Sequence, residues 1–294
     1  MITLGCAKNT VDTEIMLGEL RAKGYELTND PARAHLLIIN TCGFIQAAKE
    51  ESIASILEMA EWKEKGVCRG ILVSGCLTQR YGQQILEEMP EVDGVLGTGT
   101  LGQIDEVIKR VLAGERVLAV ADPAYDYDTA PKRLRVTPKY SAYVKIAEGC
   151  DHRCSYCAIP LIRGAYRSRD RNSIIREVQD LSREGVQEIN LIAQDVTRYG
   201  LDRYGRLGLA SLLQDLLQIE GPAWFRLLYA YPTHFSPDLI DLMRKESRFV
   251  EYIDLPLQHI SPRLLREMRR PDPAQPVLLD SEAVTLEPRH DAVH

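Results

Sequence analysis

Short apolar runs alternate with amphipathic segments through the first 120 residues of the chain. The run at 36–39 leads into Asn40-Thr41-Cys42-Gly43, and residues 46–65 then carry apolar side chains at helical spacing. The runs at 71–73 and 92–96 precede expected helices at 79–89 and 101–112 in the same way. Strands that read as continuous apolar runs between helices belong to parallel sheets covered on both faces. The pattern therefore predicts an α/β fold, with a doubly wound parallel sheet domain over residues 1–121.

A second βα series follows a stretch of different character. Residues 122–140 contain prolines, tyrosines and charges without periodicity, so we expect an interdomain linker there. Beyond it, expected strands at 143–147, 188–192, 225–229 and 252–255 alternate with expected helices at 172–184, 209–219, 237–245 and from about 263. Four such units predict an incomplete (βα) partial barrel over residues 141–270, with its chemistry at the carboxyl ends of the strands. Residues 271–294, rich in proline and acidic residues, are expected to form a disordered tail.

Composition narrows the class of protein. The 294 residues are 45% hydrophobic and 27% charged, with no apolar run long enough for a membrane span and no secretory signal, so we expect a cytoplasmic protein without a membrane partner. The net charge of -6 disfavours a surface built throughout to bind nucleic acid. A local basic stretch could still contact nucleic acid, although the expected function does not require it. The alternative is that the stretch is a solvated loop followed by the start of a helix. This stretch comprises Arg163, Arg167, Arg169, Arg171 and Arg176.

The strongest chemical signal is a Cys-x3-Cys-x2-Cys loop, formed by Cys150, Cys154 and Cys157 directly after an expected strand. Three thiolates at this spacing can bind three irons of a 4Fe-4S cluster and leave the fourth iron open, as in catalytic metal centres. A zinc site would need a fourth ligand, which His152 inside the loop is poorly placed to supply. An electron carrier is also disfavoured, because carriers normally complete the ligation with a fourth cysteine.

Three further cysteines, Cys6, Cys42 and Cys76, each lie just past an expected parallel strand. The ends of such strands share one edge of the sheet, where ligand sites form, so these thiolates are predicted to hold a second cluster. The alternative is three ordinary buried cysteines. Cys68 follows a helix and belongs to neither set, so we interpret it as a small packing residue.

The loop from Cys150 to Cys157, with Tyr156 before its last cysteine, resembles the signature of the radical S-adenosylmethionine (SAM) superfamily. Its flanks, together with the segments around the other three cysteines, resemble the methylthiotransferase family, and this favours the cluster interpretation of both sets. The segments concerned are Gly5-Cys6, Asn40-Thr41-Cys42, Ser74-Gly75-Cys76, Cys157-Ala158-Ile159-Pro160-Leu161-Ile162-Arg163-Gly164 and Arg167-Ser168-Arg169.

One branch of that family modifies an adenosine of tRNA, and another modifies an aspartate of protein twelve of the small ribosomal subunit. Leu4-Gly5-Cys6-Ala7-Lys8-Asn9 resembles the ribosomal branch, because the tRNA branch tends to carry Gln-Met where Ala7-Lys8 stand. The segments 154–160 and 191–195 point the same way. The expected activity is thus methylthiolation of the ribosomal aspartate, with a tRNA adenosine as the alternative substrate.

The resemblance implies two 4Fe-4S clusters, SAM and a reductant protein. The cluster on Cys150, Cys154 and Cys157 would cleave SAM to a 5′-deoxyadenosyl radical that abstracts hydrogen from the substrate β-carbon. The cluster on the other three cysteines would present the sulfur, after its methylation by a second SAM. Tyr156 is implied to pack near the SAM adenine, and Gln194 to touch SAM, although Gln194 also fits an ordinary polar loop residue. No catalytic residue is implied beyond the cluster ligands.

The resemblance covers roughly residues 2–270. Family members continue through two more barrel strands and a C-terminal TRAM domain, neither of which is recognisable here, and their first strand begins upstream of Ile2. We therefore expect a C-terminally truncated copy, and an inactive remnant is a further alternative. Gln258 and His259 lie in another stretch that the family shares, and no role is assigned to them.

Overall fold

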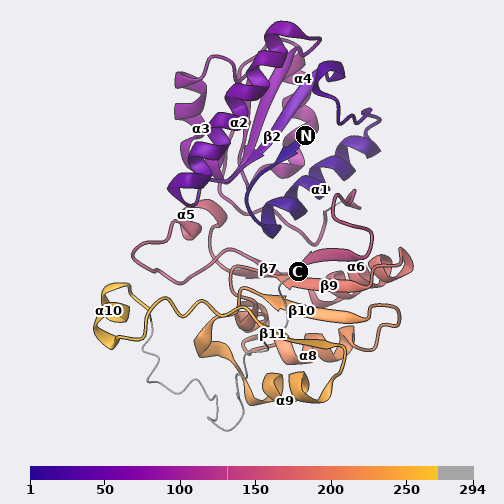
Figure 1. Cartoon of the computed structure of the whole chain (residues 1–294), viewed down its shortest axis with the longest axis vertical. Coiled ribbons are helices and arrows are strands. Elements are labelled where there is room, and N and C mark those ends of the chain that lie inside the picture. Colours follow the sequence, from indigo (N-terminus) through magenta and orange to yellow (C-terminus); the bar gives the residue numbers. More distant parts are fainter. Residues whose placement is uncertain (131, 271–294) are drawn as a thin grey trace, which may run out of the picture.

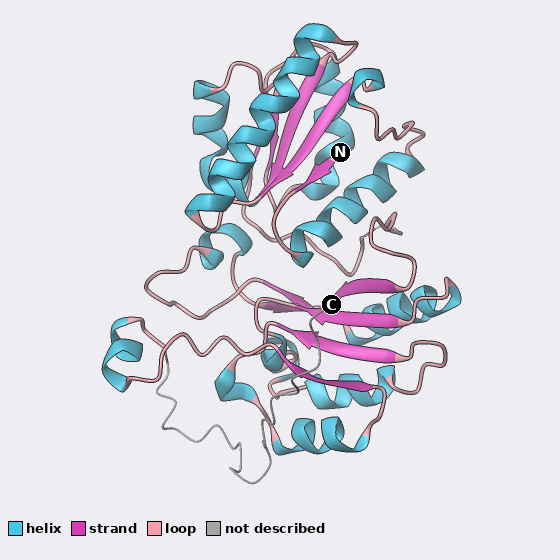
Figure 2. Cartoon of the chain, in the orientation of Figure 1, coloured by secondary structure: helices cyan, strands magenta, loops and turns pink. Residues whose placement is uncertain are grey.

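The computed structural model describes residues 1–130 and 132–270, which form two α/β units, each with its own parallel sheet (Figure 1). The first sheet has five strands in the order β1-β2-β3-β4-β5, and every neighbouring pair is parallel. These strands are β1 (Ile2–Thr3), β2 (Leu36–Thr41), β3 (Gly70–Gly75), β4 (Gly94–Leu96) and β5 (Val117–Ala119). Their carboxyl ends point toward the second unit (Figure 2).

Helices cover both faces of the first sheet because successive strand residues point to opposite sides. Leu37 and Ile39 of β2 pack with α2 and α3, whereas Ile38 between them packs with α1 and α4. Both faces are therefore apolar, which is why the strands read as continuous hydrophobic runs. The helices are α1 (Ala7–Ala22), α2 (Gln46–Lys65), α3 (Cys76–Glu88) and α4 (Ile104–Leu112).

The second sheet has four parallel strands in the order β11-β10-β9-β6. Helices pack on one face of it, and the other face turns toward the first unit, so that Ile192 of β9 joins the core around α1. The strands are β6 (Ser141–Lys145), β9 (Glu188–Ile192), β10 (Trp224–Leu228) and β11 (Phe249–Ile253), and β7 (Ala147–Glu148) pairs antiparallel with β8 (Arg167–Ser168). The helices are α5 (Ile159–Arg163), α6 (Arg171–Arg183), α7 (Leu201–Tyr204), α8 (Leu209–Leu216), α9 (Pro237–Lys245) and α10 (Pro262–Glu267).

The sequence pattern predicts α2, β9 and α9 at their observed bounds but misses α1. Asp12 of α1 is buried against the second unit and Glu14 against the connecting segment, so buried polar positions beside the apolar face obscure the helical pattern. The strand expected at 252–255 lies at 249–253, and the helix expected from 79 already begins at Cys76.

The segment expected as a linker connects the two units but packs closely on α1. The hydroxyl of Tyr127 donates a hydrogen bond to Asp12 at 2.9 Å, and Arg133 forms an ion pair with Glu14 at 2.8 Å. These contacts tie the segment to the first unit, so the connection is part of the interface between the two units. The tail expected over 271–294 lies outside the described residues.

The structure divides the five arginines after the last cysteine into buried and accessible ones. Arg163 and Arg169 are buried, which corrects their interpretation as solvated residues, whereas Arg171 is partly exposed and Arg176 is exposed at the start of α6. Arg169 forms an ion pair with Glu177 at 2.6 Å, and Arg167 donates to the backbone carbonyls of Ala165 and Pro123. Arg163 connects the two units through its ion pair with Asp12 of α1. None of the helices in the described part of the chain has the length and hydropathy of a membrane span.

Candidate functional site

The structure brings together the loops that carry Cys6, Cys42 and Cys76. Gly5 lies against Cys42, so that a carbon added to its α-carbon would stand 2.8 Å from Cys42 Cβ and 3.1 Å from the sulfur. Burial raises the pKa of the Cys76 thiol to about 11; neighbouring Cys6 and Cys42 add to this effect and Arg163 opposes it. Cys6 and Cys42 thus lie within electrostatic range of Cys76, at the carboxyl edge of the first sheet where the sequence leads us to expect all three.

Asn9 joins all three cysteine loops through one buried amide. Its Nδ2 donates to the carbonyl of Leu4 at 3.0 Å and to that of Thr41 at 2.9 Å. Its Oδ1 accepts from the Cys76 thiol at 3.3 Å. Because Leu4 and Thr41 immediately precede the loops of Cys6 and Cys42, the three cysteines are held in one arrangement. Sequence analysis missed this role, since the contacts span up to 67 residues.

Gly5→Ala is expected to displace Cys42 and to remove about half of the iron that the chain binds on anaerobic reconstitution. Gly114→Ala is the matched control, because Gly114 has the same φ of +89° but nothing within 4 Å of the added carbon. Both variants carry the same backbone strain, roughly 1–2 kcal/mol. Only the carbon added by Gly5→Ala contacts a cysteine. Equal iron content in the two variants would contradict the proposed contact.

The second cysteine set lies in the loop that follows β7, with Cys150 and Cys154 buried and Cys157 partly exposed. The Cys150 amide donates to the carbonyl of Gly164 at 3.0 Å, and the Cys157 amide donates to that of Cys154 at 3.1 Å, so the loop is compact. Burial raises the pKa of the Cys150 thiol to about 11, and the neighbouring charges of Asp195, Cys157 and Cys154 add to this shift. As in the first set, the thiols lie close enough for the charge of one to shift the pKa of another.

Asp195 anchors this loop to the end of β9. Its Oδ2 lies 2.9 Å from His152 Nε2 and 3.3 Å from His234 Nδ1, while Tyr231 stacks on the His152 ring at 3.8 Å. The other oxygen of Asp195 accepts from the amide and hydroxyl of Thr197, so the carboxylate is fully used within the protein. These four residues therefore position the loop, a role that the sequence did not indicate because the partners lie 39 and 43 residues apart.

Two buried polar atoms beside this loop have no hydrogen-bond partner among residues 1–130 and 132–270. These are Oε1 of Gln194 and the hydroxyl of Tyr231. The amide nitrogen of Gln194 donates to Glu148, which leaves its oxygen free for a ligand. Tyr156 is half exposed, and its hydroxyl accepts from Arg270 at 3.2 Å. The positions expected to contact SAM thus present unsatisfied or accessible groups.

A buried network of charges connects the two cysteine sets. Lys145 lies 2.6 Å from both Asp12 and Glu148, and Arg163 lies 2.5 Å from Asp12 and 3.4 Å from Glu148. Arg163 also donates to the sulfur of Cys76 at 3.2 Å. Burial favours the neutral form of Glu148, but Lys145 and Arg163 outweigh it and hold the pKa of this carboxyl well below its ordinary value. Since Glu148 stands two residues before Cys150, the network runs from one set to the other.

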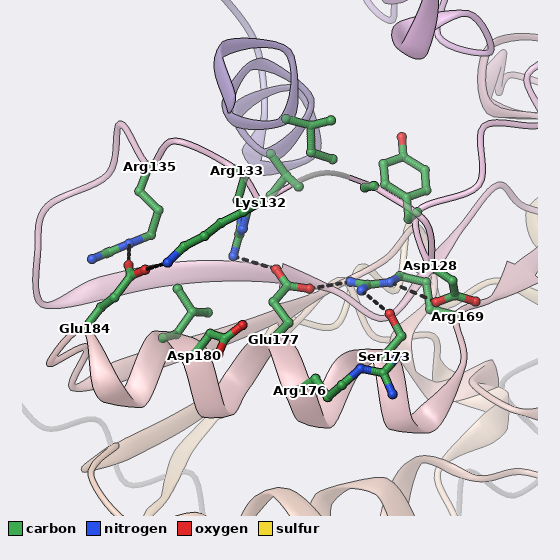
Figure 3. Close-up of a pocket in the computed structure, with 15 residues that line it drawn as sticks. Asp128, Lys132, Arg133, Arg135, Arg169, Ser173, Arg176, Glu177, Asp180 and Glu184 are labelled. Carbon is green, nitrogen blue, oxygen red and sulfur yellow. Dashed lines mark hydrogen bonds and ion pairs between the residues drawn. The ribbon is translucent and has the colours of Figure 1, made fainter. Parts of the chain in front are cut away.

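A cavity of about 250 Å³ lies away from the cysteines, between the connecting segment and α6 (Figure 3). Its charged side chains pair across it: Arg133 and Arg169 with Glu177, and Lys132 and Arg135 with Glu184. This pairing indicates a structural contact between the connecting segment and α6.

The remaining positions singled out by the sequence lie outside both cysteine sets. Gln258 is exposed with φ of 69°, and His259 accepts a hydrogen bond through Nδ1 from the Ser261 amide at 2.8 Å. Cys68 packs in the core with α2 and donates to the carbonyl of Gly70. The interpretation of Cys68 as a packing residue agrees with this position.

Comparison with known proteins finds two family matches. Residues 1–97 match the uncharacterised protein family UPF0004, and residues 144–278 match the radical SAM superfamily. The structure is similar to the radical SAM methyltransferase TsrM from Kitasatospora setae, with a TM-score of 0.63 over 90% of this chain and 58% of that chain at 13% identity. It is also similar to the cobalamin-dependent radical SAM enzyme OxsB, with a TM-score of 0.57 over 92% of this chain and 45% of that chain at 12% identity. These structural likenesses support the fold.

Curated relatives are much more similar in sequence. The ribosomal protein uS12 methylthiotransferase RimO of Desulforamulus reducens is 53% identical over 92% of this chain and 61% of its own length. RimO of Heliobacterium modesticaldum is 52% identical over 91% of this chain and 58% of its own length. The chain therefore spans about three fifths of the length of these relatives.

Proposed function

We propose that this chain is a radical SAM methylthiotransferase and that it provides the catalytic core for methylthiolation of an aspartate of ribosomal protein uS12. The observation that carries the proposal is the presence of two separate three-cysteine sets, joined by one buried network, in a chain about half identical to uS12 methylthiotransferases. Residues 1–121 and 141–270 are the proposed domains, and the reaction would take place in the cytoplasm with a reductant protein.

The donor chemistry of both sets fits 4Fe-4S clusters, because three thiolates in each set match soft iron and leave one iron free. We assign Cys6, Cys42 and Cys76 to one cluster and Cys150, Cys154 and Cys157 to the other. SAM fits beside the second set, where Gln194 Oε1 and the Tyr231 hydroxyl lack partners within the described residues and Tyr156 is accessible. When bound, the clusters supply an electron for SAM cleavage and an iron that holds the sulfur to be transferred.

The chain's own residues hold and shield these groups. Asn9 fixes the spacing of the first three cysteines, and Asp195 orients the loop of the other three through His152. The amide nitrogen of Gln194 donates a hydrogen bond to Glu148, so the amide oxygen of Gln194 points away from the buried charge network. Arg163 adds a positive charge beside Cys76, and this favours the thiolate form that binds iron.

The activity test is incubation of the anaerobically reconstituted chain with purified uS12, SAM and a reductant, followed by mass analysis of uS12. We expect uS12 to gain one methylthio group in place of one hydrogen, at an aspartate. A parallel reaction with tRNA is expected to leave every adenosine unmodified. Modification of tRNA instead of uS12 would assign the chain to the other branch, and SAM cleavage without any modified product would contradict the proposed substrate.

A further inference from the structure

Lys8 carries a buried positive charge at the contact between the two units. Its side chain leaves α1 two residues after Cys6, is 7% exposed, and places Nζ 2.8 Å from the centre of the Tyr229 ring. Within residues 1–130 and 132–270, no carboxylate lies within ion-pair distance of this ammonium group, and it donates no hydrogen bond. A fully buried charge normally has a partner, so Lys8 stands out.

The neighbouring carboxylates are already occupied. Asp12 and Glu148 each contact both Lys145 and Arg163, so two anions are shared by two cations. Lys8 is a third cation beside this balanced set. An anion bound by Lys8 would therefore gain a counter-charge without displacing an existing ion pair.

Tyr229 supports the ammonium group but does not neutralise it. The residue follows β10 with φ of 68°, a conformation that is costly for a tyrosine. Its amide donates to Asp254 at 3.1 Å, and its carbonyl accepts from the amide of Val196 at 3.1 Å, so the backbone is fixed on both sides. A ring face attracts a cation through its quadrupole while leaving the charge and its N–H donors available for an anion.

Lys8 lies near residues that adjoin both cysteine sets. It stands two residues after Cys6, and the next residue, Asn9, bonds to Cys76. Glu148, whose charge acts on Lys8, stands two residues before Cys150. A ligand held at Lys8 would thus lie near both sets.

We propose that Lys8 binds the side-chain carboxylate of the uS12 aspartate and thereby places its β-carbon between the two cysteine sets. The proposal rests on the proposed function and adds a residue that selects an acidic side chain. A carboxylate adjoins the β-carbon of aspartate, so holding this group limits the motion of the reacting carbon. SAM also carries a carboxylate, and the test separates the two sources.

The test is a double-mutant cycle on binding to the reconstituted full chain. The dissociation constant is measured for uS12 and for uS12 with the target aspartate changed to asparagine, using the wild-type chain and Lys8→Met. The wild-type chain is expected to bind the aspartate form at least about tenfold more tightly, and Lys8→Met is expected to lose this preference. Lys49→Met is the matched control, since Lys49 also lies over a tyrosine ring, that of Tyr81, and it should keep the preference.

Several outcomes would overturn the role of Lys8. Lys8→Met could weaken both forms of uS12 equally, weaken SAM binding while keeping the aspartate preference, or lower the iron content. Lys8→Gln, which keeps a polar end, is the second variant if Lys8→Met does not fold, and an undiminished aspartate preference in it also contradicts the proposal. Failure of the proposed function can be told apart from failure of the role of Lys8, because the wild-type chain would then leave uS12 unmodified in the mass analysis.

Discussion

Cys76→Ser is expected to lower the iron content of the reconstituted chain from about eight atoms to about four and to abolish methylthiolation of uS12. Cys76 is buried, its thiol bonds to Asn9, and Arg163 donates to its sulfur, so the position offers no space for a substitute ligand. A serine hydroxyl is a much harder ligand than a thiolate and does not retain a cluster iron.

The same experiment separates the roles of the two cysteine sets. Cys150→Ser should also halve the iron content, but it should in addition abolish reductive cleavage of SAM, which Cys76→Ser should retain. Cys68→Ser is the control from the opposite end of β3, because Cys68 is equally buried and its hydrogen bond to Gly70 can be kept by a hydroxyl. Iron and SAM cleavage are measured on each anaerobic sample. A Cys76→Ser chain that still binds about eight irons would remove the first cluster from the proposal.

Arg163→Met is expected to destabilise the chain by about 3–5 kcal/mol, measured as the change in urea unfolding under reducing, anaerobic conditions. The substitution leaves Asp12 and Glu148, both buried, to share the single charge of Lys145. It also removes the donor to Asn9 and Cys76, so the two units lose a direct connection. An unbalanced buried charge is costly because the interior does not solvate it.

Arg171→Met provides the matched control for this prediction. Arg171 pairs with Asp215, but their side chains are 35% and 39% exposed, so loss of the pair should cost less than about 1 kcal/mol. The double variant Arg163→Met with Asp12→Asn is expected to recover part of the lost stability, since it removes the excess negative charge and leaves Glu148 paired with Lys145. Equal costs for Arg163→Met and Arg171→Met would show that the buried network does not hold the units together.

The local sequence predicts the βα alternation and the strand ends where both cysteine sets lie. Runs such as 36–39 and 188–192 are recognisable because strands buried on both faces must be continuously apolar. The spacing of Cys150, Cys154 and Cys157 specifies a three-thiolate loop by itself, since the ligands lie within one turn of chain. Cys6, Cys42 and Cys76 could be placed together only through the expectation that parallel strands end at a common edge.

The contacts that make these positions a site were decided by the tertiary structure. Asn9, Asp195 and Arg163 appear as ordinary polar residues in the sequence, because the partners that give them their roles include residues between 32 and 154 positions away. The helix α1 escaped prediction for the same reason: beside its apolar face, polar residues such as Asp12 are buried against charges of the second unit. Local periodicity reports burial against apolar groups, whereas burial among paired charges leaves no periodic signal. Only the assembled fold reveals which charges are paired and which, like Lys8 within the described part of the chain, are not.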